Sequence, residues 1–160
     1  MSMTTNQPSV VDSGEFTVRR TVTIAAPIDK VWAAITEAEH IARWFPNRVV
    51  LDTVAPGASG VFSWDDFGDI PVRIEELDPP RMIAYRWSND SANSEDPGRV
   101  DFTRSTVFRF TLEPRDDGTQ LTVVESGFDA LADPAASMES NRGGWDSELD
   151  ELVAYLESGS

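Results

Sequence analysis

The sequence contains no cysteine and only one histidine, His40. The absence of cysteine excludes disulfides, thiolate metal sites and thiol nucleophiles, and it is typical of a reducing compartment, so we expect a cytoplasmic protein. A single histidine cannot by itself form a catalytic triad or a metal site. The acidic cluster of Asp65, Asp66 and Asp69 lacks the alternating ligand spacing of a calcium loop. We therefore predict no metal, no cofactor and no catalytic residues, and we favour a protein that is not an enzyme.

Basic residues are also scarce. Lysine occurs once, at Lys30, and 13 basic side chains stand against 28 acidic ones, which gives a net charge of −15. Such a surface repels phosphate backbones and anionic lipids, so we predict neither a nucleic-acid partner nor a membrane partner. No apolar stretch approaches the ~20 residues that a membrane-spanning helix needs. Residues 1–14 are polar and do not resemble a signal peptide, so we expect a disordered N-terminal tail followed by one domain over residues 15–160.

Alternating apolar and polar residues predict seven strands. In the first, over residues 16–24, Arg20 shares one face with Val18, Val22 and Ile24. The other strands are predicted at residues 49–54, 60–64, 70–74, 83–87, 108–112 and 121–124. Short turns between them, such as Asp117-Gly118, predict antiparallel pairing.

Helical spacing of apolar residues predicts two short helices after the first strand, one from Pro27 and one over residues 37–44. Asp133-Pro134 predicts the start of a long C-terminal helix. Its apolar stripe consists of Met138, Trp145, Leu149, Leu152, Val153 and Leu156. A long helix with one apolar face must lie across the sheet. The predicted fold class is α+β, a curved seven-stranded antiparallel sheet wrapped around the long C-terminal helix.

Two glycines, Gly143 and Gly144, interrupt the long helical segment. Each costs ~1 kcal/mol against alanine inside a helix, and such a cost usually has a packing reason. Close approach of the helix to the sheet, or a kink, would explain them. Alternatively, the helix starts only at Trp145.

Five groups of residues follow one another in a characteristic order along the chain. They are Ala26-Pro27 to Val31-Trp32, Ile35-Thr36 to Trp44-Phe45, Pro79-Pro80-Arg81 with Tyr85 and Trp87, Gly118-Thr119 to Glu125-Ser126-Gly127-Phe128, and Gly144-Trp145 with Leu149, Leu152 and Leu156. Over residues 16–157 this order resembles the helix-grip superfamily of START-like (SRPBCC) domains. More narrowly, it resembles bacterial relatives of the activator of the heat-shock-protein-90 ATPase, C-terminal domain. The resemblance implies a helix-grip fold with a cavity between long helix and sheet, and no shared catalytic residues. The eukaryotic activator acts on its chaperone with a separate N-terminal domain that has no counterpart here, which argues against a chaperone partner.

The favoured function is therefore binding of a small apolar ligand, lipid-like or polyketide-like. The candidate cavity residues are those expected on the inner faces of sheet and helix: Arg20, Trp64, Tyr85, Trp87, Phe108, Phe110, Glu125, Met138, Trp145 and Leu149. Core packing is the alternative for Trp87 and Trp145. Two other functions stay open, a cyclase or aromatase acting on a polyketide-like substrate through a shaped pocket and one or two polar groups, and a protein-interaction module for a chaperone or regulator in the stress response. A homodimer is compatible with the sequence.

Two charged residues have inward parity, Arg20 in the first strand and Glu125 in the last. The resemblance implies that these two strands are antiparallel neighbours. Charges that face an apolar interior cost desolvation unless they meet, so we predict a salt bridge between Arg20 and Glu125 on the inner wall. The alternative is a bulge that turns one of them to solvent.

Overall fold

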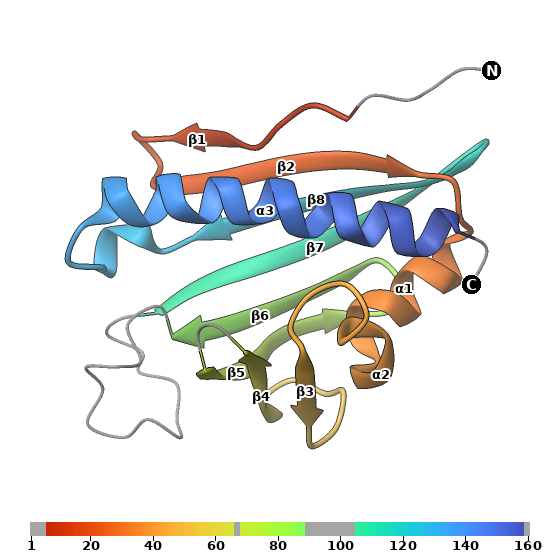
Figure 1. The fold of residues 1–160 in the computed structure, drawn as a ribbon, viewed down its shortest axis with the longest axis horizontal. Coiled ribbons are helices and arrows are strands. Elements are labelled where there is room, and N and C mark those ends of the chain that lie inside the picture. The colour runs from red at the N-terminus through yellow and green to blue at the C-terminus, as the bar shows by residue number, and fades with distance from the viewer. Residues whose placement is uncertain (1–5, 66–67, 89–104, 159–160) are drawn as a thin grey trace.

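An eight-stranded antiparallel sheet dominates the computed structural model, in the order β1-β2-β8-β7-β6-β5-β4-β3 (Figure 1). The structure describes residues 6–65, 68–88 and 105–158. The strands are β1 (Val10–Asp12), β2 (Thr17–Ile24), β3 (Arg48–Leu51), β4 (Ser59–Trp64), β5 (Gly68–Asp78), β6 (Met82–Ser88), β7 (Ser105–Arg115) and β8 (Gly118–Ser126). Seven of them correspond to the predicted strands. The predicted strand count is wrong by one, because β1 forms within the segment expected to be a tail.

Residues 6–14 contact β2 and the C-terminal helix. The prediction of a disordered tail over residues 1–14 is therefore wrong for residues 6–14. β1 pairs antiparallel with β2. The buried Ser9 donates its amide to Asp146 Oδ1 at 2.6 Å, and Asn6 Oδ1 accepts from the Thr23 amide at 2.9 Å. These bonds join polar groups, so no apolar periodicity reveals the segment. Residues 1–5 lie outside the described residues.

Strand alternation decides which side chains enter the core. In β2, Val18 and Val22 are fully buried, whereas the intervening Arg19 and Thr21 are exposed. The same alternation carries Arg20 and Glu125 inward, where they are 4% and 0% exposed. The inward parity predicted for both charged residues is confirmed, and no bulge turns either one to solvent.

Within the described residues, four helical segments complete the fold: α1 (Ile28–Thr36), α2 (Ala38–Ile41), the 3-10 turn η2 (Phe128–Ala130) and α3 (Pro134–Glu157). α3 lies along the sheet beside β2 (Figure 1). Asp133 caps its N-terminus by accepting the Ala136 amide at 3.2 Å, as predicted. The predicted stripe is confirmed: Met138, Trp145, Leu149, Leu152 and Leu156 are buried, and Val153 is half-buried. Within the described residues, no helix combines the length and apolar character that crossing a membrane requires.

Gly143 and Gly144 lie inside α3, so a helix start at Trp145 is wrong. Both glycines are exposed. No atom lies within 4 Å of the place where a Cβ would stand on either residue. Close approach to the sheet therefore does not explain them, and the structure shows no other packing reason.

The outer face of the sheet carries ion pairs both between strands and within β5. Arg86 Nε lies 2.6 Å from Glu75 Oε1, and Arg73 Nε lies 3.5 Å from Glu75 Oε2. Arg109 pairs with Glu76 on the same sheet. Each of these three arginines thus lies beside a carboxylate.

Candidate functional site

Aromatic side chains gather between the inner face of the sheet and α3. Neighbouring ring centroids lie 4.6–6.5 Å apart, mostly in tilted or edge-to-face arrangements. Phe45, from the segment after α2, contacts rings from β4, β6, β7 and α3. The members of this aromatic cluster are Trp44, Phe45, Phe62, Trp64, Tyr85, Trp87, Phe108, Phe110 and Trp145. All are buried except Trp64 and Trp87, which are half-buried.

Glu125 lies at the edge of the aromatic cluster and joins three strands to α3. Trp145 Nε1 donates to its Oε1 at 2.9 Å, and Trp87 Nε1 donates to its Oε2 at 2.9 Å. The Thr106 hydroxyl donates to Oε2 at 2.5 Å. Asn141 Nδ2 lies 3.0 Å from Oε1 and 3.1 Å from Oε2. Four neutral donors therefore occupy the acceptor positions of one fully buried carboxyl group.

Glu125 has no cationic partner in the part of the chain that the structure describes. Among the described residues, no arginine, lysine or histidine nitrogen lies within 4.0 Å of its oxygens. Burial raises the pKa of the Glu125 carboxyl, and the hydrogen bonds from Thr106, Trp87, Trp145 and Asn141 oppose that rise. Glu125 is therefore a neutral carboxylic acid below its raised pKa and an unpaired negative charge above it.

Tyr85 is the other titratable group in the aromatic cluster. Its hydroxyl donates to the Ile35 carbonyl at 2.6 Å. Burial raises the pKa of this phenol far above its ordinary value, so the group stays neutral. Tyr85 therefore links β6 to α1, and its hydroxyl keeps its proton at physiological pH.

The predicted salt bridge between Arg20 and Glu125 is wrong. The register places Val18 opposite Glu125, and Arg20 opposite Val123, two positions away from the predicted pairing. Arg20 instead reaches α3, with Nη1 2.8 Å from the Asp146 carbonyl and Nη2 2.8 Å from Asp150 Oδ1. Its Nε donates to the Gln7 carbonyl at 3.0 Å.

Arg20 also donates to the Trp145 carbonyl at 3.3 Å. The two buried charges are thus connected through one residue, because the indole of Trp145 binds Glu125. The prediction failed because the Arg20 side chain is long enough to bond to α3. The long side chain of Arg20 finds carbonyl and carboxylate acceptors on α3, and neutral donors satisfy Glu125.

The remaining candidates from the sequence, Met138 and Leu149, are buried on α3 at 3% and 0% exposure. Sequence reasoning missed Thr106, Asn141 and Phe45. Thr106 has the inward parity of Phe108 and Phe110, and Asn141 precedes Trp145 by one helical turn, so both signals were available. Phe45 lies outside any strand or helix and had no periodic signal.

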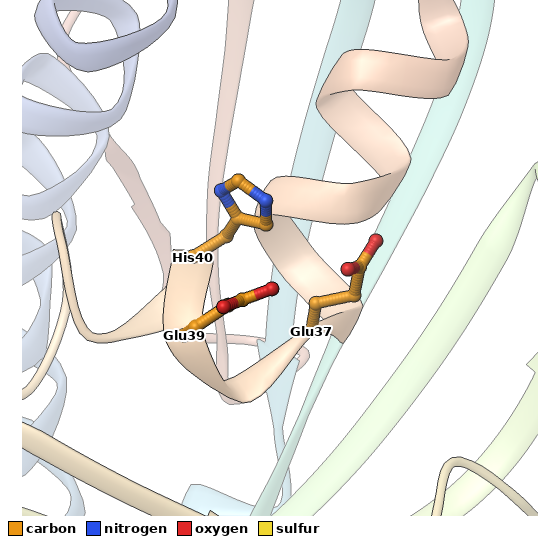
Figure 2. Close-up of side chains that lie close together, drawn as sticks. All are labelled: Glu37, Glu39 and His40. Carbon is orange, nitrogen blue, oxygen red and sulfur yellow. The ribbon is translucent and has the colours of Figure 1, made fainter. Parts of the chain in front are cut away.

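His40 lies with Glu37 and Glu39 at α2, where Figure 2 shows the three side chains grouped. Their ligand atoms lie within 4.8 Å of one another. His40 Nδ1 is 2.7 Å from the Tyr155 hydroxyl, which ties α2 to α3. One imidazole and two exposed carboxylates are a ligand short of a closed tetrahedral protein site, so the group carries no functional assignment.

The chain belongs to the family of Activator of Hsp90 ATPase homolog 1-like proteins, whose family model matches residues 25–157. This membership confirms the resemblance found in the sequence, and the sheet with its long C-terminal helix is the helix-grip fold of START-like domains. A search of curated proteins finds no match.

Several solved structures share the fold. Protein MLL2253 from Mesorhizobium loti is 25% identical with a TM-score of 0.75, and the alignment covers 90% of this chain and 98% of that one. DynU16, from the dynemicin biosynthetic locus, is 25% identical with a TM-score of 0.71; the alignment covers 90% of this chain but 48% of DynU16, so this chain spans about half its length. The Aha1 dimer from Colwellia psychrerythraea is 17% identical with a TM-score of 0.70, over 90% of this chain and 98% of that one.

Proposed function

We propose that this chain is a binding domain for a small apolar molecule, held against the aromatic cluster between α3 and the inner face of the sheet. The observation that carries the proposal is the partial exposure of Trp64 and Trp87. A core that closes on itself buries its largest apolar side chains, whereas these two rings leave apolar surface available at one end of the cluster. Exposed aromatic surface that continues into a buried cluster favours ligand binding.

The composition of the region supports the same function. Binding sites for small molecules are lined mainly by apolar and aromatic side chains, with a few polar groups that orient the ligand. The aromatic cluster, together with Met138 and Leu149, provides the apolar lining, and Glu125 provides a buried polar group beside it. DynU16 comes from a biosynthetic locus, which is a small-molecule context.

The geometry favours binding over catalysis. A cyclase or aromatase would need an acid–base group that can reach its substrate. Tyr85 donates to a backbone carbonyl, and the oxygens of Glu125 accept from four side chains, so neither is poised for proton transfer. A chaperone partner rests on the family name alone.

Native mass spectrometry of freshly purified protein tests the proposal. We expect a small-molecule adduct on the 17.6 kDa chain that disappears on denaturation. The neutral fluorophore N-phenyl-1-naphthylamine should bind, and Trp87→Ala should weaken this binding, whereas Val50→Ala should not, because Val50 is exposed on the edge strand β3. An adduct-free spectrum together with no fluorophore binding would contradict the function.

The same spectrum tests whether the chain forms a homodimer. The Aha1 of Colwellia psychrerythraea is described as a dimer in solution, although at 17% identity it shares the fold alone. A species at twice the mass of the chain, whose share falls on dilution, is the expected result. A monomer at every concentration would exclude a stable homodimer.

A further inference from the structure

Three rings form an open corner at the exposed end of the aromatic cluster. Trp64 and Trp87 are half-buried, their centroids lie 5.9 Å apart, and their planes are inclined at 58°. Phe45 stands against both, at 5.4 Å from Trp64 and 5.7 Å from Trp87. We call these three residues the aromatic corner. Both indoles keep part of their surface exposed, and the electron-rich face of an indole is the surface that attracts cations.

The buried carboxyl group of Glu125 lies behind this corner and carries a negative charge when it is ionised. Trp87 Nε1 donates to Glu125 Oε2 at 2.9 Å, so the indole of Trp87 bridges the corner and the buried carboxyl group. Donation to a carboxylate makes the indole more electron-rich, which strengthens the attraction of its face for a cation. Glu125 is 0% exposed and has no basic partner among the described residues. The net charge of −15 adds a long-range attraction for cations.

The hydrogen bonds of Glu125 also restrict the kind of cation. Its oxygens already accept from Trp87, Trp145, Thr106 and Asn141, so the carboxyl group has no free position for a ligand N–H. A primary ammonium would lose hydration at the corner without gaining an acceptor. A quaternary or fully alkylated ammonium has no N–H to satisfy and binds through its methyl groups against ring faces.

We propose that the aromatic corner binds an alkylated organic cation, with Glu125 as the buried counter-charge that acts through the indole of Trp87. The proposal rests on the proposed function and names the chemical class of the ligand. The ammonium group lies against Trp64 and Trp87, and the apolar remainder of the ligand follows the aromatic cluster. Glu125 keeps its hydrogen bonds from all four donors when the ligand binds.

Three matched probes test the charge requirement. Benzyltrimethylammonium is the cation, neopentylbenzene is its neutral isostere with carbon in place of nitrogen, and phenylacetate is the anion. Binding is followed through the indole N–H signals in nuclear magnetic resonance spectra, each assigned by a single tryptophan-to-phenylalanine change. We expect the cation to shift the signals of Trp64 and Trp87 and to bind roughly tenfold more tightly than the isostere. The signal of Trp32, which lies on α1, should not move.

Variants then locate the effect. Trp64→Leu should weaken cation binding roughly tenfold, whereas the matched control Trp32→Leu, at another half-buried tryptophan, should leave it unchanged. Glu125→Gln should remove the preference for the cation over the isostere and retain binding of the isostere. If circular dichroism shows that Glu125→Gln does not fold, Trp87→Phe keeps a ring face but loses the bond to Glu125, and should lose most of the preference.

The outcomes separate this proposal from the proposed function. Equal affinity for cation and isostere, or tighter binding of phenylacetate, would overturn the cation proposal and leave apolar binding intact. A preference that survives in both Glu125→Gln and Trp87→Phe would overturn the role of Glu125. If no probe shifts the signals of Trp64 and Trp87, both proposals fail.

Discussion

Replacing Glu125 by glutamine or by leucine distinguishes the two contributions of this carboxyl group, its hydrogen-bond acceptors and its charge. Glutamine preserves the shape and one acceptor oxygen, whereas leucine preserves much of the volume and neither oxygen. Because Glu125 is 0% exposed, water cannot replace the lost acceptors. The stability of both variants can therefore be worked out from the four donors that surround the group.

In Glu125→Gln, the remaining oxygen should take the position of Oε1. There it keeps the bond from Trp145, whose indole N–H can only donate. The new amide nitrogen then faces the Thr106 hydroxyl, which can accept from it, and Trp87 keeps Thr106 Oγ1 at 3.0 Å as an alternative acceptor. About one or two net hydrogen bonds are lost, so we expect a cost of ~1–2 kcal/mol.

In Glu125→Leu, the Trp145 indole and the Asn141 amide both lose their acceptor. Trp145 is buried, and an unsatisfied buried donor costs ~1–3 kcal/mol, whereas the half-buried Asn141 loses its bonds to Glu125 at a cost of about 1 kcal/mol. The leucine variant should therefore lose ~2–4 kcal/mol in total. Trp87 again retains Thr106. Leucine should therefore be clearly the more damaging change, although it is the more apolar residue in an apolar interior.

The charge of Glu125 makes the comparison depend on pH. Burial raises the pKa of this carboxyl in the folded state. The stability linked to such a raised pKa is fully present below the ordinary value of 4.5 and is lost as pH rises through the folded pKa. Glutamine does not titrate, so the deficit of Glu125→Gln should be largest near pH 5 and should shrink toward pH 8.

Urea denaturation followed by tryptophan fluorescence at both pH values measures these differences, and circular dichroism confirms that the variants fold. A leucine variant as stable as the glutamine variant would refute the role of the four donors. A glutamine deficit that grows with pH would refute the view that the charge of Glu125 destabilises the ligand-free fold.

Four further predictions follow from burial, exposure and charge. Trp145→Ala should cost at least ~3–5 kcal/mol in urea denaturation, since the side chain is 2% exposed and also donates to Glu125; a loss below ~1 kcal/mol would contradict its place in the core. Gly143→Ala and Gly144→Ala should each stabilise the fold by up to ~1 kcal/mol, because both positions are helical and have room for a Cβ. A lower melting temperature of either variant would contradict this expectation. Burial, with a smaller effect of Glu151, raises the pKa of Glu148 to about 7, so stability present below the ordinary value of 4.5 is lost as pH rises through about 7. Glu148→Gln should therefore raise the melting temperature at about pH 8, by roughly 2–4 °C after allowance for partial exposure, and should have little effect near pH 4; the opposite order would be evidence against this shift. Gel shift and vesicle sedimentation at physiological salt should detect no binding to DNA or anionic lipid, because the net charge is −15 and outer-face arginines such as Arg86 pair with carboxylates; micromolar affinity for either would contradict this.

Local patterns in the sequence were sufficient for the seven strands from β2 to β8, for the start of α3, and for the inward direction of Arg20 and Glu125. The alternation in β2 and β8 predicted that Arg20 and Glu125 point inward, and both do. Asp133 was recognisable as a helix cap because capping involves residues only three positions apart. The stripe of α3 was readable for the same reason, since helical periodicity is a property of neighbouring residues.

The tertiary structure alone decided which inward side chains meet. The register of β2 against β8 joins residues about one hundred positions apart, and a shift of two residues keeps every side chain on the same face, so parity cannot detect it. That shift, with the reach of Arg20 to α3, separated two charges expected to pair. β1 escaped prediction because backbone and polar contacts hold it rather than apolar periodicity. The four donors around Glu125 come from β6, β7 and α3, and only the packing of these elements brings them to one carboxyl group.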